Sequence, residues 1–192
     1  MLDGPPDPDA HGSAPKTRPA VGPDALRHVL GHFATGVTVV TSLLDGNPRG
    51  VTVSAFMSVS LDPPLVLVAL DQARSLGPVI QAVGAYAVNI LGEDDVHLSE
   101  CFAGAAVTPD RDSFCAVAWR PGVLGMPILD RAIASIECRL QRVVRVGDHD
   151  FLVGRVVAAT GDDRHPPPLL YYRRRYHRLE PATVPIDAMP DL

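Results

Sequence analysis

Short runs of β-branched and apolar residues, separated by turn residues, restrict the possible folds of this 192-residue chain more than any other feature. Residues 37–44 and 50–53 form one pair of such runs, and the segment 45–48 between them has the composition of a turn. Residues 132–146 and 151–160 form a second pair, again with turn residues between them. Each pair predicts a β-hairpin, so antiparallel strands should dominate the structure.

Other strands and a few helices are predicted around these hairpins. Residues 65–70 are an uninterrupted apolar run, which predicts a buried strand. A further strand is expected at 85–91, and the segments 169–172 and 176–179 are expected to be either edge strands or a closing flap. Helical periodicity marks the segments 24–33, 75–83 and 94–103. Many short strands with few helices predict a mainly β protein, a closed β-barrel with peripheral α-helices.

The first predicted helix is amphipathic. Its apolar side carries Leu26, Val29, Leu30 and Phe33. Pro23 suits the first helical turn, and Gly36 stands where a left-handed C-terminal cap is expected. The helix should therefore end shortly before Gly36.

Composition and charge indicate one domain and argue against several function classes. The 46% of apolar residues suffice for a single core. The net charge of −5 does not indicate binding to nucleic acid or to an anionic membrane. No apolar run reaches the roughly 18 residues of a transmembrane helix, and the N-terminus has no signal-peptide pattern. We expect a cytoplasmic protein with a flexible tail (1–22), one domain (23–182) and a C-terminal tail (183–192).

The cysteines and histidines show no disulfide or metal signature. Cys101, Cys115 and Cys138 are odd in number and widely spaced, with no C-x-x-C motif. This pattern predicts three reduced, buried thiols. His28 and His32 have a helical spacing that can chelate a metal, but no third ligand matches them, so no metal site is expected.

Two segments, 35–41 and 52–64, alternate hydroxyl residues with apolar ones. On a strand this alternation places hydroxyls on one face and methyl groups on the other. Small hydroxyl residues beside backbone N–H groups can cradle a phosphate or the polar edge of a ring. The alternative is a half-exposed strand pair in which Thr serves β propensity alone.

The same segments are similar to those of a known family. Residues 33–41 (FATGVTVVT) and 52–66 (TVSAFMSVSLDPPLV) resemble the flavin reductase-like family, the small reductase components of two-component flavin-dependent monooxygenases. The likeness continues in order through 86–91, 101–104, 136–138, 147–149, 151–154 and 170–172. It therefore covers about residues 24–180.

The resemblance implies an FMN-binding split β-barrel of the Greek-key type that works as a homodimer, with the flavin near the subunit interface. It also implies an NAD(P)H:flavin oxidoreductase that passes hydride from NADH or NADPH to FMN or FAD and supplies reduced flavin to a partner monooxygenase. The cofactors carry this chemistry themselves, so no catalytic triad or metal cluster is needed. Two alternatives stay open: a flavin-binding carrier or sensor without turnover, and a related split-barrel oxidase.

Site residues follow from the same resemblance, position by position. Those implied to border the isoalloxazine are Gly36, Val37, Thr38 and Val39. Those implied to contact the flavin ring edge, ribityl chain and phosphate are Thr52, Val53, Ser54, Ala55, Ser58, Ser60 and Ser75. Those implied in a loop beside the flavin and in the variable segment after it are Phe102, Ala103, Gly104 and Arg111. Tyr172 and Arg175 are implied to border the nucleotide site.

His149 is the one candidate catalytic residue. The resemblance places this histidine of the Gly147-Asp148-His149 turn where the nicotinamide approaches. An imidazole there can hydrogen-bond the carboxamide or supply partial positive charge during hydride transfer. The alternative is a solvated turn histidine with no role in the reaction.

Overall fold

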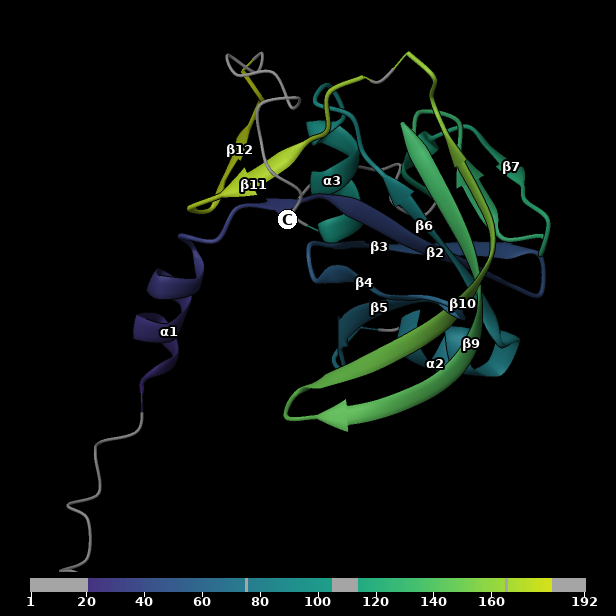
Figure 1. The fold of residues 1–192 in the computed structure, drawn as a ribbon, viewed down its shortest axis with the longest axis horizontal. Coiled ribbons are helices and arrows are strands. Elements are labelled where there is room, and N and C mark those ends of the chain that lie inside the picture. Colours follow the sequence, from purple (N-terminus) through teal and green to yellow (C-terminus); the bar gives the residue numbers. More distant parts are fainter. Residues whose placement is uncertain (1–20, 75, 105–113, 165, 181–192) are drawn as a thin grey trace, which may run out of the picture.

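Seven antiparallel strands form the main sheet of the computed structural model, which describes residues 21–74, 76–104, 114–164 and 166–180 (Figure 1). The predicted C-terminal tail 183–192, residues 1–20 of the predicted N-terminal tail, Ser75 and Arg111 lie outside the described residues. In spatial order the strands are β3 (Asn47–Val53), β2 (Thr38–Leu44), β6 (Ala85–Ile90), β9 (Ala134–Val146), β10 (His149–Gly161), β5 (Pro64–Asp71) and β4 (Phe56–Leu61). The expectation of a mainly β fold is confirmed.

The sheet curls until its two edges approach each other. Val51 and Val53 of edge strand β3 share one apolar core with Val66 and Val68 of β5. The chain crosses from one edge to the other in two residues, because Ser54 and Ala55 alone separate β3 from β4. The result is a barrel that is split between β3 and the β4–β5 hairpin, with no strand ladder across the split among the named strands.

Strand β5 shows why only one face of the sheet is fully buried. Val66, Val68 and Leu70 are buried, whereas Leu65 and Leu67 between them are only half-buried. The prediction of a buried strand therefore holds for one face only, since successive side chains point to opposite faces and only the inner face meets the core. An apolar outer face therefore remains partly uncovered in the single chain.

Two helices complete the packing around the barrel. Helix α2 (Leu76–Val83) adds Leu76 and Ile80 to the barrel core. Helix α3 (Val96–Ala103) packs beside β3 and belongs to a second apolar cluster through Leu98 and Phe102. Strands β7 (Trp119–Pro121) and β8 (Pro127–Leu129) form a separate small hairpin. The segments predicted as helices at 75–83 and 94–103 are thus confirmed with slightly shorter bounds.

Helix α1 (Pro23–Leu30) stands apart from the barrel (Figure 1). It has no buried residue, and the apolar side chains Leu26, Val29, Leu30 and Phe33 are all exposed. The helix ends at Gly31, whose backbone is right-handed and whose carbonyl accepts the N–H of Arg173 at 3.0 Å. This bond turns the chain away from the helix early, so the predicted cap at Gly36 was wrong.

Gly36 instead belongs to a short sheet beside α1. Strands β1 (Thr35–Gly36), β11 (Leu170–Tyr172) and β12 (Arg175–His177) pair in the order β1-β11-β12. Tyr171 and Tyr176 pack edge-on in this sheet at 5.4 Å between ring centroids. The early segment β1 and the late segment β11 therefore pair next to α1 and not at the barrel split.

Within the described ranges, no helix is long and apolar enough to cross a membrane.

Among the described residues, no group of three or more His, Cys, Asp or Glu could hold a metal ion. His32 already contacts protein groups at both ring nitrogens, the His28 carbonyl at 3.0 Å and the Arg173 guanidinium at 3.1 Å.

Candidate functional site

A cavity of about 190 Å³ lies at the split of the barrel. Residues of two walls line it. The first, which we call the helix-backed wall, is the end of β3 with the crossing residues: Val51, Thr52, Val53, Ser54 and Ala55. The second, the hairpin wall, is the end of β5 with the start of β10: Ala69, Leu70, Asp71 and His149. Arg74 lies at the rim.

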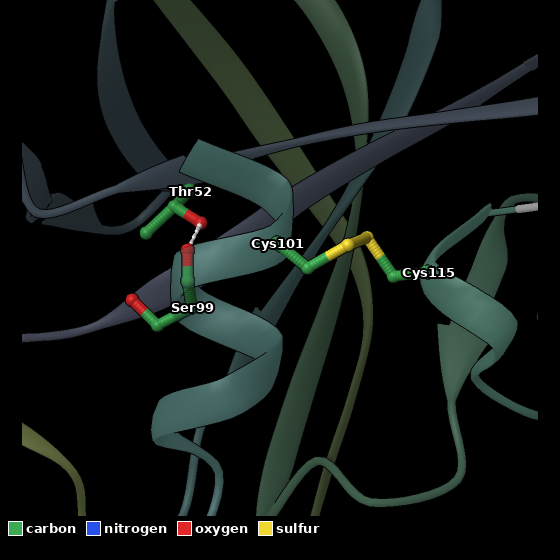
Figure 2. The surroundings of a disulfide bond; sticks show 4 residues. All are labelled: Thr52, Ser99, Cys101 and Cys115. Atoms are coloured by element: carbon green, nitrogen blue, oxygen red, sulfur yellow. Dashed lines mark hydrogen bonds between the residues drawn. A yellow bond between two sulfur atoms is a disulfide. The ribbon is translucent and has the colours of Figure 1, made fainter. Parts of the chain in front are cut away.

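The helix-backed wall is fixed to α3. Thr52 donates its hydroxyl hydrogen to the carbonyl of Ser99 at 2.7 Å (Figure 2). Ser54 and Ala55 lie between the registered pairs of β3 and those of β4, and Ala55 accepts the N–H of Ala69 at 3.0 Å. Small side chains at the crossing let a flat ligand approach the backbone closely, which a polar cofactor edge requires.

Two of the hydroxyl groups that the sequence singles out are used inside the barrel. Thr38 donates to the carbonyl of Val53 at 2.7 Å, and Thr41 donates to that of Pro127 at 2.6 Å. Both side chains are buried. These hydroxyls therefore hold strands together, and the hypothesis of a phosphate cradle was wrong for Thr38 and Thr41.

His149 opens strand β10 opposite Asp71 of β5, so it belongs to a strand and not to the turn. Its Nδ1 lies 2.7 Å from the Asp148 carboxylate, and the imidazole is half-exposed. The hydrogen bond with His149 lowers the pKa of Asp148, which therefore stays ionised at neutral pH. Because a carboxylate only accepts, Nδ1 carries the hydrogen, and Nε2 of a neutral ring is the acceptor.

A glutamine holds the turn that precedes His149. The Gln72 backbone N–H donates to the carbonyl of Asp148 at 3.0 Å. Its side-chain Nε2 lies 3.2 Å from the carbonyl of His149 and 3.1 Å from the Asp150 carboxylate. Sequence reasoning missed Gln72, because a residue that acts through backbone carbonyls has no recognisable motif.

The rim carries both signs of charge. Arg74 donates to the carbonyl of Ala103 at 3.1 Å, which leaves most of its five N–H groups for other acceptors. Asp71, in the hairpin wall, accepts the N–H of Ala73 at 2.8 Å through its carboxylate and that of Arg74 at 2.9 Å through its carbonyl. Both charged residues thus belong to one short segment at the end of β5, where a guanidinium suits a phosphate. Neither residue was among the predicted site residues.

The structure unites only part of the predicted set. The residues that line the cavity are Thr52, Val53, Ser54, Ala55 and His149. Phe102, Ala103 and Gly104 lie at the C-terminal end of α3, where the Ala103 carbonyl accepts a hydrogen bond from Arg74. Ser58 and Ser60 lie further along β4. Those that do not line it are Gly36, Val37, Thr38, Val39, Tyr172 and Arg175; the first four lie along the β1–β2 segment and the last two in β11 and β12.

Two cysteines close to the cavity form a disulfide. Cys101 of α3 is joined to Cys115, with their Cα atoms 6.0 Å apart (Figure 2). The prediction of three reduced thiols was wrong for this pair and holds for Cys138, which is buried and free. A spacing of 14 residues has no signature, and the partners meet because Phe102 packs edge-on against Phe114 at 5.0 Å.

Comparisons with known proteins agree with this architecture. The family model described as "Flavin reductase like domain" matches residues 30–180. An NADH-dependent flavin reductase of a Rhodococcus species is 42% identical over 151 residues, which are 77% of this chain and 82% of that protein. The reductase subunit HsaB of a flavin-dependent monooxygenase from Rhodococcus jostii is 36% identical over 174 residues, covering 90% and 87%.

Among solved structures, the NADH:FAD oxidoreductase SgcE6 of Streptomyces globisporus, in complex with NAD and FAD fragments, superposes with a TM-score of 0.76. It is 34% identical, and the match covers 84% of this chain and 94% of that one. The family match spans most of the chain, including both walls of the cavity and their supports. The chain therefore belongs to the flavin reductase-like family.

Proposed function

We propose that this protein is an NADH-dependent flavin reductase that transfers hydride from the nicotinamide to FMN or FAD. The observation that carries the proposal is the cavity at the barrel split, where Ser54 and Ala55 on one wall face His149 on the other. When bound, the flavin supplies the hydride-accepting chemistry itself. The chain has to bind two ring systems, align them and exclude water.

The residues of the helix-backed wall fit a flavin. Val51, Val53 and Ala55 offer apolar surface for a ring, and Ser54 offers a hydroxyl and backbone groups outside the strand registers. Arg74 gives the rim a cation of the kind that binds phosphate. We assign flavin binding to this wall, with Ser75 and Arg111 as further candidates from the resemblance alone.

His149 would serve the nicotinamide side. The Asp148 hydrogen bond orients the ring, and Gln72 holds the backbone on which it stands. An oriented imidazole can hydrogen-bond the carboxamide or stabilise charge that shifts during hydride transfer, without acting as an obligatory acid. NADPH is the less favoured donor, since the relatives above are described with NADH or NAD.

The acceptor of reduced flavin would be a separate monooxygenase. The relative from Rhodococcus jostii is the reductase subunit of such an enzyme, which supports the same division of labour here. A cytoplasmic location suits a protein that consumes NADH. Neither nucleic acid nor a membrane surface has a place in this proposal, given the net charge of −5.

The proposal includes a homodimer. The cavity of one chain is smaller than the roughly 300–1,000 Å³ of typical ligand pockets, so a second subunit would complete it. Leu61 is 91% exposed, and Met57 and Val59 on the same strand are also exposed. Phe33 beside α1 is 75% exposed. A second copy would cover such apolar surfaces, and light scattering that finds an active monomer at micromolar concentration would contradict this part.

Steady-state oxidation of NADH tests the proposed reaction. Purified protein should consume NADH only when FMN or FAD is added, and the two flavins tested side by side would rank the preference. NADPH in place of NADH should give slower turnover. Flavin binding without turnover would support the carrier or sensor instead, and no affinity for either flavin would refute the flavin site.

A further inference from the structure

Helix α3 holds two residues of the cavity, Thr52 in the helix-backed wall and Arg74 at the rim. Thr52 donates to the carbonyl of Ser99 at 2.7 Å, and Arg74 donates to the carbonyl of Ala103 at 3.1 Å. Both donors line the cavity. Cys101 lies between the two acceptors on the helix, so the disulfide is attached to the segment that holds these two cavity residues (Figure 2).

The other end of the disulfide carries an aromatic contact. Phe114, next to Cys115, is buried and packs edge-on against Phe102. Both rings lie over Gly50 of β3, where an added Cβ would come within 2.7 Å of the Phe102 ring and 3.3 Å of the Phe114 ring. The disulfide therefore ties together α3, Phe114 and the strand that forms the helix-backed wall.

We propose that Cys101 and Cys115 form a reversible oxidation site, whose disulfide holds the helix-backed wall in its flavin-binding arrangement. The proposal rests on the flavin site proposed above. The oxidised protein should bind flavin more tightly than the dithiol form, because reduction removes the covalent tie between α3 and Phe114 while the hydrogen bonds to Thr52 and Arg74 remain.

The reaction of the enzyme provides the oxidant. Reduced flavin that is released and not used by a monooxygenase reacts with oxygen, giving oxidised flavin and hydrogen peroxide. The half-exposed Cys115 thiolate would attack the peroxide, so that the O–O bond breaks, a sulfenic acid forms and, with one proton, water leaves. The Cys101 thiol would then attack this sulfur, the S–O bond breaks, and a second water leaves as the disulfide forms.

Cys138 provides an internal contrast. Its thiol is fully buried in the barrel core, and this burial raises its pKa to about 12. The thiolate is the form that attacks peroxide, so Cys138 should stay reduced under conditions that oxidise the pair. In a cell where the monooxygenase leaves reduced flavin unused, the peroxide that forms would thus oxidise the pair. The reductase would change from a flavin-releasing form to a flavin-retaining one.

The first experiment compares two redox states of the full chain. One sample is reduced with dithiothreitol and desalted without oxygen, and the other is treated with hydrogen peroxide. Thiol counts in denaturant should be three and one, since the chain has three cysteines and one disulfide. The Kd for FMN, from fluorescence quenching, should be at least about threefold higher in the reduced sample.

Two variants sharpen this comparison. Cys115→Ser cannot form the disulfide and should show the same high Kd before and after peroxide. Cys138→Ala keeps the pair and should respond to peroxide as the natural chain does. Equal Kd values in the two redox states of the natural chain, with thiol counts of three and one, would overturn the proposed control. Absence of FMN binding in both states would overturn the flavin site as well.

The second experiment asks whether turnover itself closes the disulfide. Reduced protein is given NADH and FMN in air, with no monooxygenase present. The thiol count should fall from three to one, and catalase or exclusion of oxygen should prevent the fall. A count that stays at three in air and in added peroxide would overturn the oxidation site.

Discussion

The two walls of the cavity are held in place by very different means. The helix-backed wall is joined to α3 by the Thr52 hydrogen bond, and behind it stand a disulfide and two packed phenylalanine rings. The hairpin wall is held by the β5–β10 ladder, in which seven residues of each strand pair, and only the turn before β10 depends on hydrogen bonds from one exposed glutamine, Gln72. Elements with few buried contacts open at a lower free-energy cost. The helix-backed wall, with a disulfide behind it, suits a cofactor that is held, and the exposed turn beside His149 suits a co-substrate that comes and goes.

Removal of the His149 imidazole should have the largest effect and should fall on the hairpin wall alone. Loss of one such contact commonly costs about 1–3 kcal/mol, so we expect His149→Ala to lower kcat/KM for NADH by roughly 10–100-fold. The Kd for FMN should change by less than about threefold. His97→Ala, an exposed histidine outside the cavity, serves as the control. A collapse of FMN binding with intact NADH kinetics would reverse the assignment of the walls.

Ala55→Leu tests the opposite wall. A larger side chain at the crossing residue would hold the flavin away from the backbone, so the Kd for FMN should rise at least tenfold, or about 1.4 kcal/mol. Ala159→Leu, at an exposed position of β10, is the matched control and should leave the Kd unchanged. Equilibrium binding followed by flavin fluorescence measures both. An unchanged Kd in folded Ala55→Leu would argue against flavin contact here.

Thr52→Val probes the support behind the helix-backed wall. The variant keeps the shape of the side chain and loses the hydrogen bond to the Ser99 carbonyl, so the free energy of unfolding should fall by about 1 kcal/mol. Urea denaturation measures this loss, and the Kd for FMN should rise by about threefold. Thr52→Ser keeps the hydroxyl and should recover most of both. Equal behaviour of the Val and Ser variants would mean that the bond does not support the wall.

Gln72→Leu should loosen the hairpin wall alone. The turn before β10 would lose the side-chain bonds to the His149 carbonyl and the Asp150 carboxylate. We expect KM for NADH to rise by about threefold, with kcat and the Kd for FMN little changed. A larger effect on FMN than on NADH would show that Gln72 supports both walls.

Asp148→Asn should have the smallest effect, because the carboxylate is fully exposed. We expect a change in kcat/KM for NADH of less than about twofold at pH 7. The pKa of Asp148 is lowered by its bond with His149, so this pair contributes above the ordinary carboxyl pKa, and its contribution is lost as the pH falls through the lowered value. A profile of kcat/KM between pH 3 and 7, compared with that of Asp148→Asn, would reveal this loss.

Periodicity was enough to predict the two long hairpins and strands β5 and β6, but not the short β7–β8 hairpin, and tertiary contacts explain what else it missed. The hairpins around 45–48 and 147–150 follow from local pattern and turn residues, and both occur. Arg74 and Gln72 could not be found in this way, because each acts on a carbonyl far away in the sequence. The Cys101–Cys115 pair likewise depends on how α3 meets Phe114. The prediction of an amphipathic α1 is confirmed, but nothing in residues 21–74, 76–104, 114–164 and 166–180 covers its apolar side.

The two-residue crossing between β3 and β4 has a consequence for stability. The strands on either side of the split share a core but no ladder, so a ligand bound between the walls would add contacts that join them. By thermodynamic linkage, ligand at 100 times its Kd adds about 2.7 kcal/mol to the free energy of unfolding. The melting temperature should therefore climb with flavin concentration, and local opening at Ser54 and Ala55, followed by hydrogen exchange, should slow first.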